Sequence, residues 1–192
     1  VPGIRAEIPD VWFGVGRFED CPSTSCANSM AMIQSITDNI TLVESAIGSM
    51  TNTCGGWEPY TQDLYAIASG DVAPFASWPG VHPTSWTCTA PGAIGWPCFR
   101  TGAVPIIMQF GDESFSEGVS NCSPSRNHSQ AITAMNAINA KYVGVDSGSS
   151  RSDMLTIASG TGSVDSGGTP LVFDISSTGS GLGAQVVNAV DI

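Results

Sequence analysis

The feature that most constrains the fold is a regular alternation of short apolar runs with helical segments in the second half of the chain. Continuous apolar runs at 104–110 (VPIIMQF), 141–148 (KYVGVDSG) and 169–175 (TPLVFDI) are typical of strands buried in a sheet. Helical segments at 129–140 and 150–162 lie between them. Strands that alternate with helices form a mostly parallel sheet, so we predict a doubly wound α/β domain with helices on both faces.

The first half extends this pattern. Residues 10–19 (DVWFGVGRFE) read as a core strand, and 34–39 (QSITDN) as a short edge strand. The segment 41–50 has apolar residues at helical spacing after Thr41, a candidate N-cap, and the segment 60–70 reads as a helix that ends at a glycine. We expect a single domain over residues 1–192.

Two further segments complete the chain. Residues 71–102 contain Pro, Gly, Trp and Cys without a clear period, so we expect a long loop tied by cysteines. Residues 181–190 (GLGAQVVNAV) read as a closing helix. In parallel sheets, ligands bind in the loops that follow the carboxyl ends of the strands. This rule directs attention to the residues after Phe18, to those after Phe110, and to the Gly-rich turn at 54–59.

The cysteine pattern favours an oxidising compartment. The cysteines are Cys21, Cys26, Cys54, Cys88, Cys98 and Cys122. Zinc sites use CxxC pairs or histidine partners, and neither occurs here, so disulfides are the better interpretation. The two close pairs, 21 with 26 and 88 with 98, are candidates for bridges, which would leave the other two cysteines to form a third.

Composition points the same way. Charged residues make up 12% of the chain, well below the roughly 25% of ordinary soluble domains. The net charge of −11 excludes nucleic acid and anionic membrane surfaces as expected partners, and no apolar run is long enough to span a membrane. Sequons at Asn39, Asn121 and Asn127 are glycan acceptors if the protein is a eukaryotic secreted one. We therefore expect an extracellular or cell-surface protein.

Six segments in order resemble the von Willebrand factor A-type domain, in its integrin β I-like branch. FGVGRFEDCP (13–22) resembles that branch's second strand, and CGGWEPYTQDLYAIASG (54–70) resembles its Gly-Gly turn and following helix. VPIIMQFGDESFSEG (104–118) resembles the strand that ends in Asp before an acidic, Ser-Phe loop. NAKYVGVDSG, DMLTIASGTGS and PLVFDI complete the last two strands and the helix between them.

One departure from the family concerns its first strand. The resemblance implies a central strand that ends in an Asp-x-Ser-x-Ser motif, and nothing before residue 10 fits that motif. Residues 1–9 resemble the end of the first helix, so we expect an N-terminally incomplete domain. The missing strand would lie between the strands at 10–19 and 104–110. Either it exists as another chain or a further segment, or a partner strand fills its place.

The resemblance implies a metal-dependent adhesion site that holds Mg²⁺ or Ca²⁺. Asp112 would be a ligand through water, and Glu58 or Thr61 would contribute from the Gly-Gly turn, with Asp20 and Glu113 as outer candidates. The alternative is that these acids only cap loops and helix N-termini.

We predict a non-enzymatic adhesion or protein-recognition domain whose partner is a protein ligand or a neighbouring subunit. Neither His82 nor His128 lies near a nucleophile elbow. One alternative is a structural subunit of a surface filament or sheath, including a homo-oligomer, completed by strand addition. Another is a secreted hydrolase. The tryptophans at 57, 78, 86 and 96 either anchor a partner or pack the long loop onto the domain.

Overall fold

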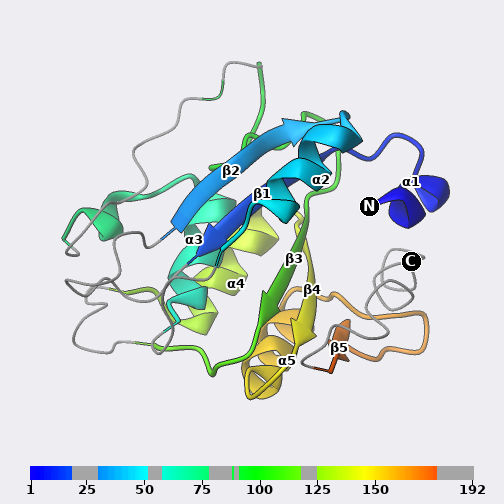
Figure 1. Cartoon of the computed structure of the whole chain (residues 1–192). Helices are drawn as coiled ribbons and strands as arrows, with labels where there is room; N and C mark the ends of the chain where they lie inside the picture. Colours follow the sequence, from blue (N-terminus) through cyan, green and yellow to red (C-terminus); the bar gives the residue numbers. More distant parts are fainter. Residues whose placement is uncertain (19–29, 52–57, 78–87, 89–90, 118–124, 177–192) are drawn as a thin grey trace.

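The computed structural model describes residues 1–18, 30–51, 58–77, 88, 91–117 and 125–176 (Figure 1). In chain order its elements are α1 (Pro2–Glu7), β1 (Phe13–Phe18), β2 (Met30–Thr37), α2 (Ile40–Gly48), α3 (Tyr60–Ser69), the 3-10 helix η1 (Ala73–Ser77), β3 (Ile106–Gly111), α4 (His128–Ala137), β4 (Lys141–Asp146), α5 (Arg151–Gly160) and β5 (Val172–Asp174). The α/β class predicted from the alternating pattern is confirmed.

The second half forms a parallel sheet in the order β3-β4-β5. Helix α4 connects β3 to β4, and α5 connects β4 to β5, so each crossover is a β-α-β unit. The central strand β4 is buried on both faces, with Tyr142 on one face and Val143 and Val145 on the other. A continuous apolar run is what such a strand requires.

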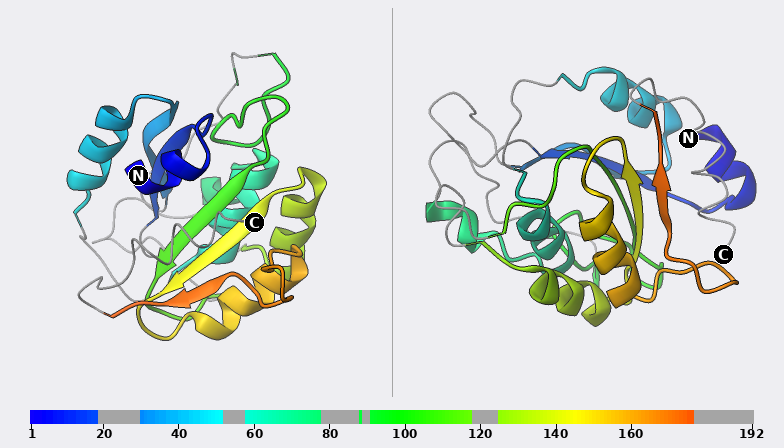
Figure 2. Two further views of the ribbon diagram at one scale, coloured as in Figure 1. Left: turned by 90° about the vertical axis from the view of Figure 1, so that its right-hand side faces the viewer. Right: turned by 90° about the horizontal axis from the view of Figure 1, so that it is seen from below.

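Helices α3, α4 and α5 lie on the same side of this sheet, and α1 and α2 lie on the other side of the strands (Figure 2). The main core forms between these three helices and the sheet, around Tyr60, Tyr142 and Met154. A side chain at Gly144 would collide with Met154, so the glycine allows α5 to lie close to β4. No helix within the described ranges has both the length and the apolar composition of a membrane span.

Strands β1 and β2 form a separate antiparallel pair with a register shift on either side of Val15. Helix α2 covers one face of the pair, where Val43 and Ala46 pack against Val15. On the other face, Met30 packs in a cluster that contains Ala66 of α3. Helix α3 therefore contacts the antiparallel pair and also forms part of the main core.

The described strands form two separate sheets, β1-β2 and β3-β4-β5. We expected the missing strand between β1 and β3, and no described strand joins these two. Lys141 donates its backbone N–H to Pro105 O, and Ser147 donates to Gly111 O, so the odd-numbered residues of β3 pair with β4. The even-numbered residues direct their backbone groups to the opposite edge, which pairs with no strand in the described part of the chain. The prediction that 104–110 is a strand buried on both faces is wrong at both ends of the run, because Val104, which precedes β3, is 62% exposed and Phe110 is 45% exposed.

Most element ends agree with the sequence signals. Helix α3 ends at Ser69 and is capped by Gly70, whose φ of 76° is the left-handed conformation that favours glycine, and α4 begins at His128, one residue before the predicted segment. The N-cap of α2 differs from the prediction. Asn39, not Thr41, occupies it, because the Asn39 side chain accepts hydrogen bonds from two backbone N–H groups of the first turn. The edge strand β2 is longer than predicted.

The long loop contains the helix η1 and one disulfide within the described residues. Cys88 and Cys98 are bonded, with their Cα atoms 5.4 Å apart. Trp96 is buried beside Phe75, so this tryptophan packs the loop onto the domain. The other predicted features lie outside the described residues: Cys21, Cys26, Cys54, Cys122, Asp20, His82, Trp57, Trp78, Trp86 and the closing helix at 181–190.

Candidate functional site

The loop after β3 lies at the carboxyl edge of the parallel sheet, the edge at which ligands bind in such folds. Its first residues are held by the loop after β4. Ser149 donates its backbone N–H to the Asp112 carbonyl oxygen at 2.6 Å, and Ser147 donates to Gly111 O at 2.9 Å. A side chain at Gly148 would collide with the Asp112 carbonyl, so this close approach requires glycine. The position of Asp112 is therefore set by backbone contacts.

A second segment, the residues before α3, pairs with the same loop. Glu58 forms a parallel β-bridge with Phe115, and the backbone N–H of Ser116 donates to Glu58 O at 2.9 Å. Tyr60 follows, packs against the Phe115 ring at 4.5 Å, and accepts hydrogen bonds at its hydroxyl from the backbone of Asp112 and its neighbour. Residues 58–60 and the loop after β3 are thus joined at one edge of the sheet.

Two of the predicted ligands affect the electrostatics of the same buried hydroxyl, that of Tyr60. Burial raises the pKa of the Tyr60 hydroxyl, and the negative charges of Glu58 and Asp112 raise it further. Both negative charges are therefore near enough to the Tyr60 hydroxyl to raise its pKa. Glu58 is only 7% exposed. These two of the three predicted metal ligands share one neighbourhood.

The third predicted ligand, Thr61, is directed elsewhere. Its hydroxyl donates to the carbonyl oxygen of Arg126 at 2.7 Å, just before α4. The next residue, Gln62, accepts a hydrogen bond from the Arg126 backbone N–H at 3.1 Å. Thr61 and Gln62 are both fully buried. They connect the first turn of α3 to the start of α4 rather than to Asp112.

Asp63 is an acid that our sequence analysis did not single out. It is 2% exposed, and neither of its carboxylate oxygens has a hydrogen-bond partner among the described residues. Burial raises the pKa of Asp63 well above its ordinary value of 3.8, and the charge of Glu58 raises it further. The helical pattern places an acid here, but the pattern alone does not distinguish a solvated acid from a buried one.

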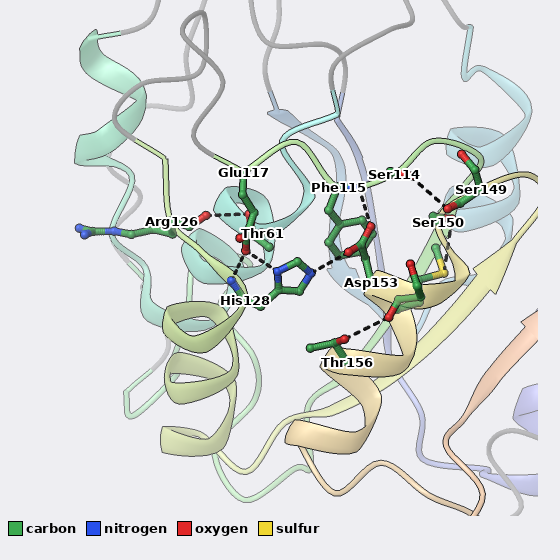
Figure 3. A network of polar contacts seen from close by, with 12 residues as sticks. Thr61, Ser114, Phe115, Glu117, Arg126, His128, Ser149, Ser150, Asp153 and Thr156 are labelled. Atoms are coloured by element: carbon green, nitrogen blue, oxygen red, sulfur yellow. Dashed lines mark hydrogen bonds and ion pairs between the residues drawn. The ribbon is translucent and has the colours of Figure 1, made fainter.

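A third group of side chains surrounds the start of α4 (Figure 3). The Nδ1 atom of His128 contacts a Glu117 carboxylate oxygen, which also accepts the His128 backbone N–H. On the opposite side of the ring, Nε2 forms an ion pair with Asp153 Oδ1 at 3.2 Å, without hydrogen-bond geometry. The Phe115 ring stacks on the imidazole with centroids 5.5 Å apart. His128 therefore joins the loop after β3, α4 and α5.

The chemistry available to His128 follows from these contacts. A neutral imidazole has one N–H, so the ring can donate to both carboxylates only when it carries a second proton. Asp153 is also bonded, since its Oδ2 accepts the Phe115 backbone N–H at 2.9 Å. In the described residues, both ring nitrogens face carboxylates and neither faces a hydroxyl or thiol. These contacts join the loop after β3 to α4 and α5.

The described residues contain some but not all of the ligands that a metal site would need. Within the ranges given above, no group of three or more His, Cys, Asp or Glu side chains is arranged to hold a metal ion. Glu58 and Asp112 supply two carboxylates, and backbone oxygens or water would have to complete any coordination shell. Comparison with models of known families and with curated proteins gave no match for this chain.

Proposed function

We propose that this chain belongs to an extracellular adhesion or protein-recognition domain of the von Willebrand A type, integrin β I-like branch. Its binding edge would use Mg²⁺ or Ca²⁺ to bridge to an acidic group on a protein ligand. The observation that carries the proposal is that the Glu58 backbone pairs with the loop that carries Asp112, at the carboxyl edge of the sheet. Carboxylate oxygens are the ligands that both cations prefer.

The resemblance supplies the remaining part of this proposal. It implies that the doubly wound sheet has a central strand between β1 and β3, and that further ligands come from the Asp-x-Ser-x-Ser motif of that strand. In the described residues β1 and β3 belong to separate sheets, which supports a further strand between them. The role is proposed as binding rather than catalysis, because His128 is engaged by Glu117 and Asp153.

A retention experiment tests the cation bridge. The protein carries a net charge of −11, so a carboxymethyl matrix should repel it in the presence of a chelator. With Mg²⁺ at constant ionic strength, we expect the wild type to be retained, because the cation links its carboxylates to those of the matrix. The variant D112N should elute early, whereas E44Q, which removes an exposed acid on α2, should behave as wild type. Equal retention of D112N and E44Q would contradict the proposal.

A second candidate function is a structural subunit of a surface filament or sheath. The edge of β3 opposite β4, which carries the backbone groups of Ile106, Met108 and Phe110, favours it. An open strand edge accepts a strand from a neighbouring chain, which could be a second copy. Sedimentation velocity over a range of protein concentrations, with and without chelator, tests this function. An assembly that survives the chelator supports it, and a monomer at all concentrations contradicts it.

A further inference from the structure

The loop after β3 is held differently at its start and at its end. Its first residues accept backbone hydrogen bonds from the loop after β4. Its later residues are held in part by ionisable side chains. The Phe115 backbone N–H donates to Asp153 Oδ2 at 2.9 Å, and the Glu117 carboxylate contacts the ring and the backbone N–H of His128. The order of these later residues therefore depends on groups that can change their charge.

His128 connects these ionisable groups. Its ring lies between the Glu117 carboxylate at Nδ1 and the Asp153 carboxylate at Nε2 (Figure 3). Asp153 in turn holds the Phe115 backbone N–H, and the Phe115 ring stacks on the imidazole with 6° between the ring planes. These contacts run from the imidazole to both acids and end on the loop after β3. A change at the imidazole therefore acts on that loop.

Only the doubly protonated ring satisfies both carboxylates. With two N–H groups, the imidazolium presents a donor and positive charge to each acid. A neutral imidazole keeps one N–H, and its other nitrogen presents a lone pair to a carboxylate. Glu117 is the closer acid and also accepts the His128 backbone N–H, so the single proton is best retained at Nδ1. Deprotonation therefore places the Nε2 lone pair against Asp153, the acid that holds Phe115.

Other charged and titratable groups belong to the elements that pack around His128. Arg126, which precedes α4, is directed away from the imidazole, because it pairs with Asp71 at 3.6 Å and lies over the Tyr65 ring (Figure 3). The buried Asp63 of α3 can also change its charge, and a His128 variant separates the two titrations. Two buried hydroxyls stay neutral at the pH values at which histidine titrates, because burial raises their pKa. They belong to Tyr60 of α3 and Tyr142 of β4.

We propose that Glu117, His128 and Asp153 form a pH-sensitive latch that holds the later residues of the loop after β3 against α4 and α5. The protonated ring keeps both acids in place. When the ring loses its proton, the contact with Asp153 is lost and the Phe115 N–H loses an ordered acceptor. The contribution of the latch to order in this loop is therefore complete in mildly acidic solution and is lost as the pH rises. None of the three is a predicted cation ligand, so the inference stands apart from the proposed function.

Amide hydrogen exchange of the wild type tests the latch, measured for each residue by NMR and corrected for the intrinsic pH dependence of exchange. From about pH 5 to about pH 8, the range in which histidine titrates, the protection of the Phe115 amide should fall at least about tenfold. This factor corresponds to the loss of one hydrogen bond to a charged group. The amides of Ser147 and Ser149, which donate to the first residues of the loop, should keep their protection. The imidazole resonances of His128 should titrate with the same midpoint as the Phe115 protection.

Variants assign the change to His128. H128N retains an amide donor near the Nδ1 position but has no titratable ring, so its Phe115 protection should not vary with pH. H82N, which removes the other histidine of the chain, should behave as wild type. Constant Phe115 protection in the wild type overturns the proposal. A pH dependence that persists in H128N also overturns it and assigns the titration to another group, such as Asp63. If H128N does not fold, as judged by circular dichroism, the wild type alone decides, because different midpoints for the imidazole and the Phe115 amide contradict the latch.

Discussion

The starts of α3 and α4 lie side by side and satisfy their polar groups in opposite ways. At α4, Asn127 and Gln130 form a reciprocal capping box, and His128 has an acid beside each ring nitrogen. At α3, the N-cap is Pro59, which provides no side-chain cap, and the buried Asp63 carboxylate has no hydrogen-bond partner in the part of the chain that the structure describes. The two ends are nevertheless joined, because Thr61 and Gln62 both bond the backbone of Arg126.

This difference separates a helix start with a side-chain cap from one that carries a buried acid without a hydrogen bond in the described residues. A helix end with a side-chain cap lowers the free energy of the fold. A buried acid without a partner costs stability, and such costs cluster at functional sites. We therefore expect substitutions that remove charge to change the free energy of unfolding in opposite directions at the starts of α4 and α3. They should destabilise the protein at α4 and stabilise the cation-free protein at α3.

The largest expected effect is that of H128A. The substitution removes the imidazole that lies between Glu117 and Asp153 and leaves the two carboxylates without the ring nitrogens that they contact. It also removes the ring on which Phe115 stacks. Because the imidazole is mostly buried, we expect a loss of about 3 kcal/mol in the free energy of unfolding, measured by urea denaturation at pH 6. S129A, at the exposed next position, is the control and should change stability by less than about 0.5 kcal/mol. A loss no greater than that of the control would mean that the cluster does not stabilise α4.

The next largest expected effect is a gain in stability in the variant D63L, and this gain depends on pH. Because burial raises the pKa of Asp63, the folded state holds this proton to higher pH than the unfolded state. The contribution of Asp63 is therefore most favourable below pH 3.8, the ordinary pKa, and is lost as the pH rises. In chelator at pH 7.5, D63L should be more stable than wild type by about 2 kcal/mol, since the unpaired buried group costs about that much. The difference should narrow toward pH 4, and a difference that is constant across this range would argue against a raised pKa for Asp63.

The sequence predicted the elements better than the environment of the side chains. Periodicity and stop signals placed α3, α4, β4 and α5 correctly, because burial patterns along the chain are local. The burial of Phe110 was overestimated, since a continuous apolar run does not reveal which strand lies at a sheet edge.

The candidate site was predictable only in part. Asp112 and Glu58 were singled out by position after a strand and before a helix, and they do lie around one hydroxyl. The contacts of His128 were not predictable, because Glu117 and Asp153 belong to a different loop and a different helix. Asp63 carried one available signal, its spacing of five residues from Glu58 across a helix start, which is the spacing of a hydrophobic staple.

A smaller effect should follow from N127A, which removes the capping box of α4. The Asn127 side chain accepts the Gln130 backbone N–H at 3.0 Å, and the Gln130 side chain accepts the Asn127 backbone N–H at 3.1 Å. Loss of such a cap costs about 1 kcal/mol. The variant N127D, which retains the acceptor, should keep most of the stability in chemical denaturation. If N127A and N127D unfold alike, the cap at α4 is not the source of its stability.

The smallest effect tests whether charge or hydrogen bonding matters at α4. E117Q keeps a side-chain oxygen that can accept the His128 backbone N–H, but it removes the negative charge beside the imidazole. Because Glu117 is partly exposed, solvent screens this ion pair, and we expect a loss of only about 0.5 kcal/mol at low salt. The loss should disappear in about 1 M NaCl, where charges are screened within roughly 3 Å. A loss that persists in high salt would mean that Glu117 acts through hydrogen-bond geometry, so the contrast with Asp63 would then concern bonding rather than charge.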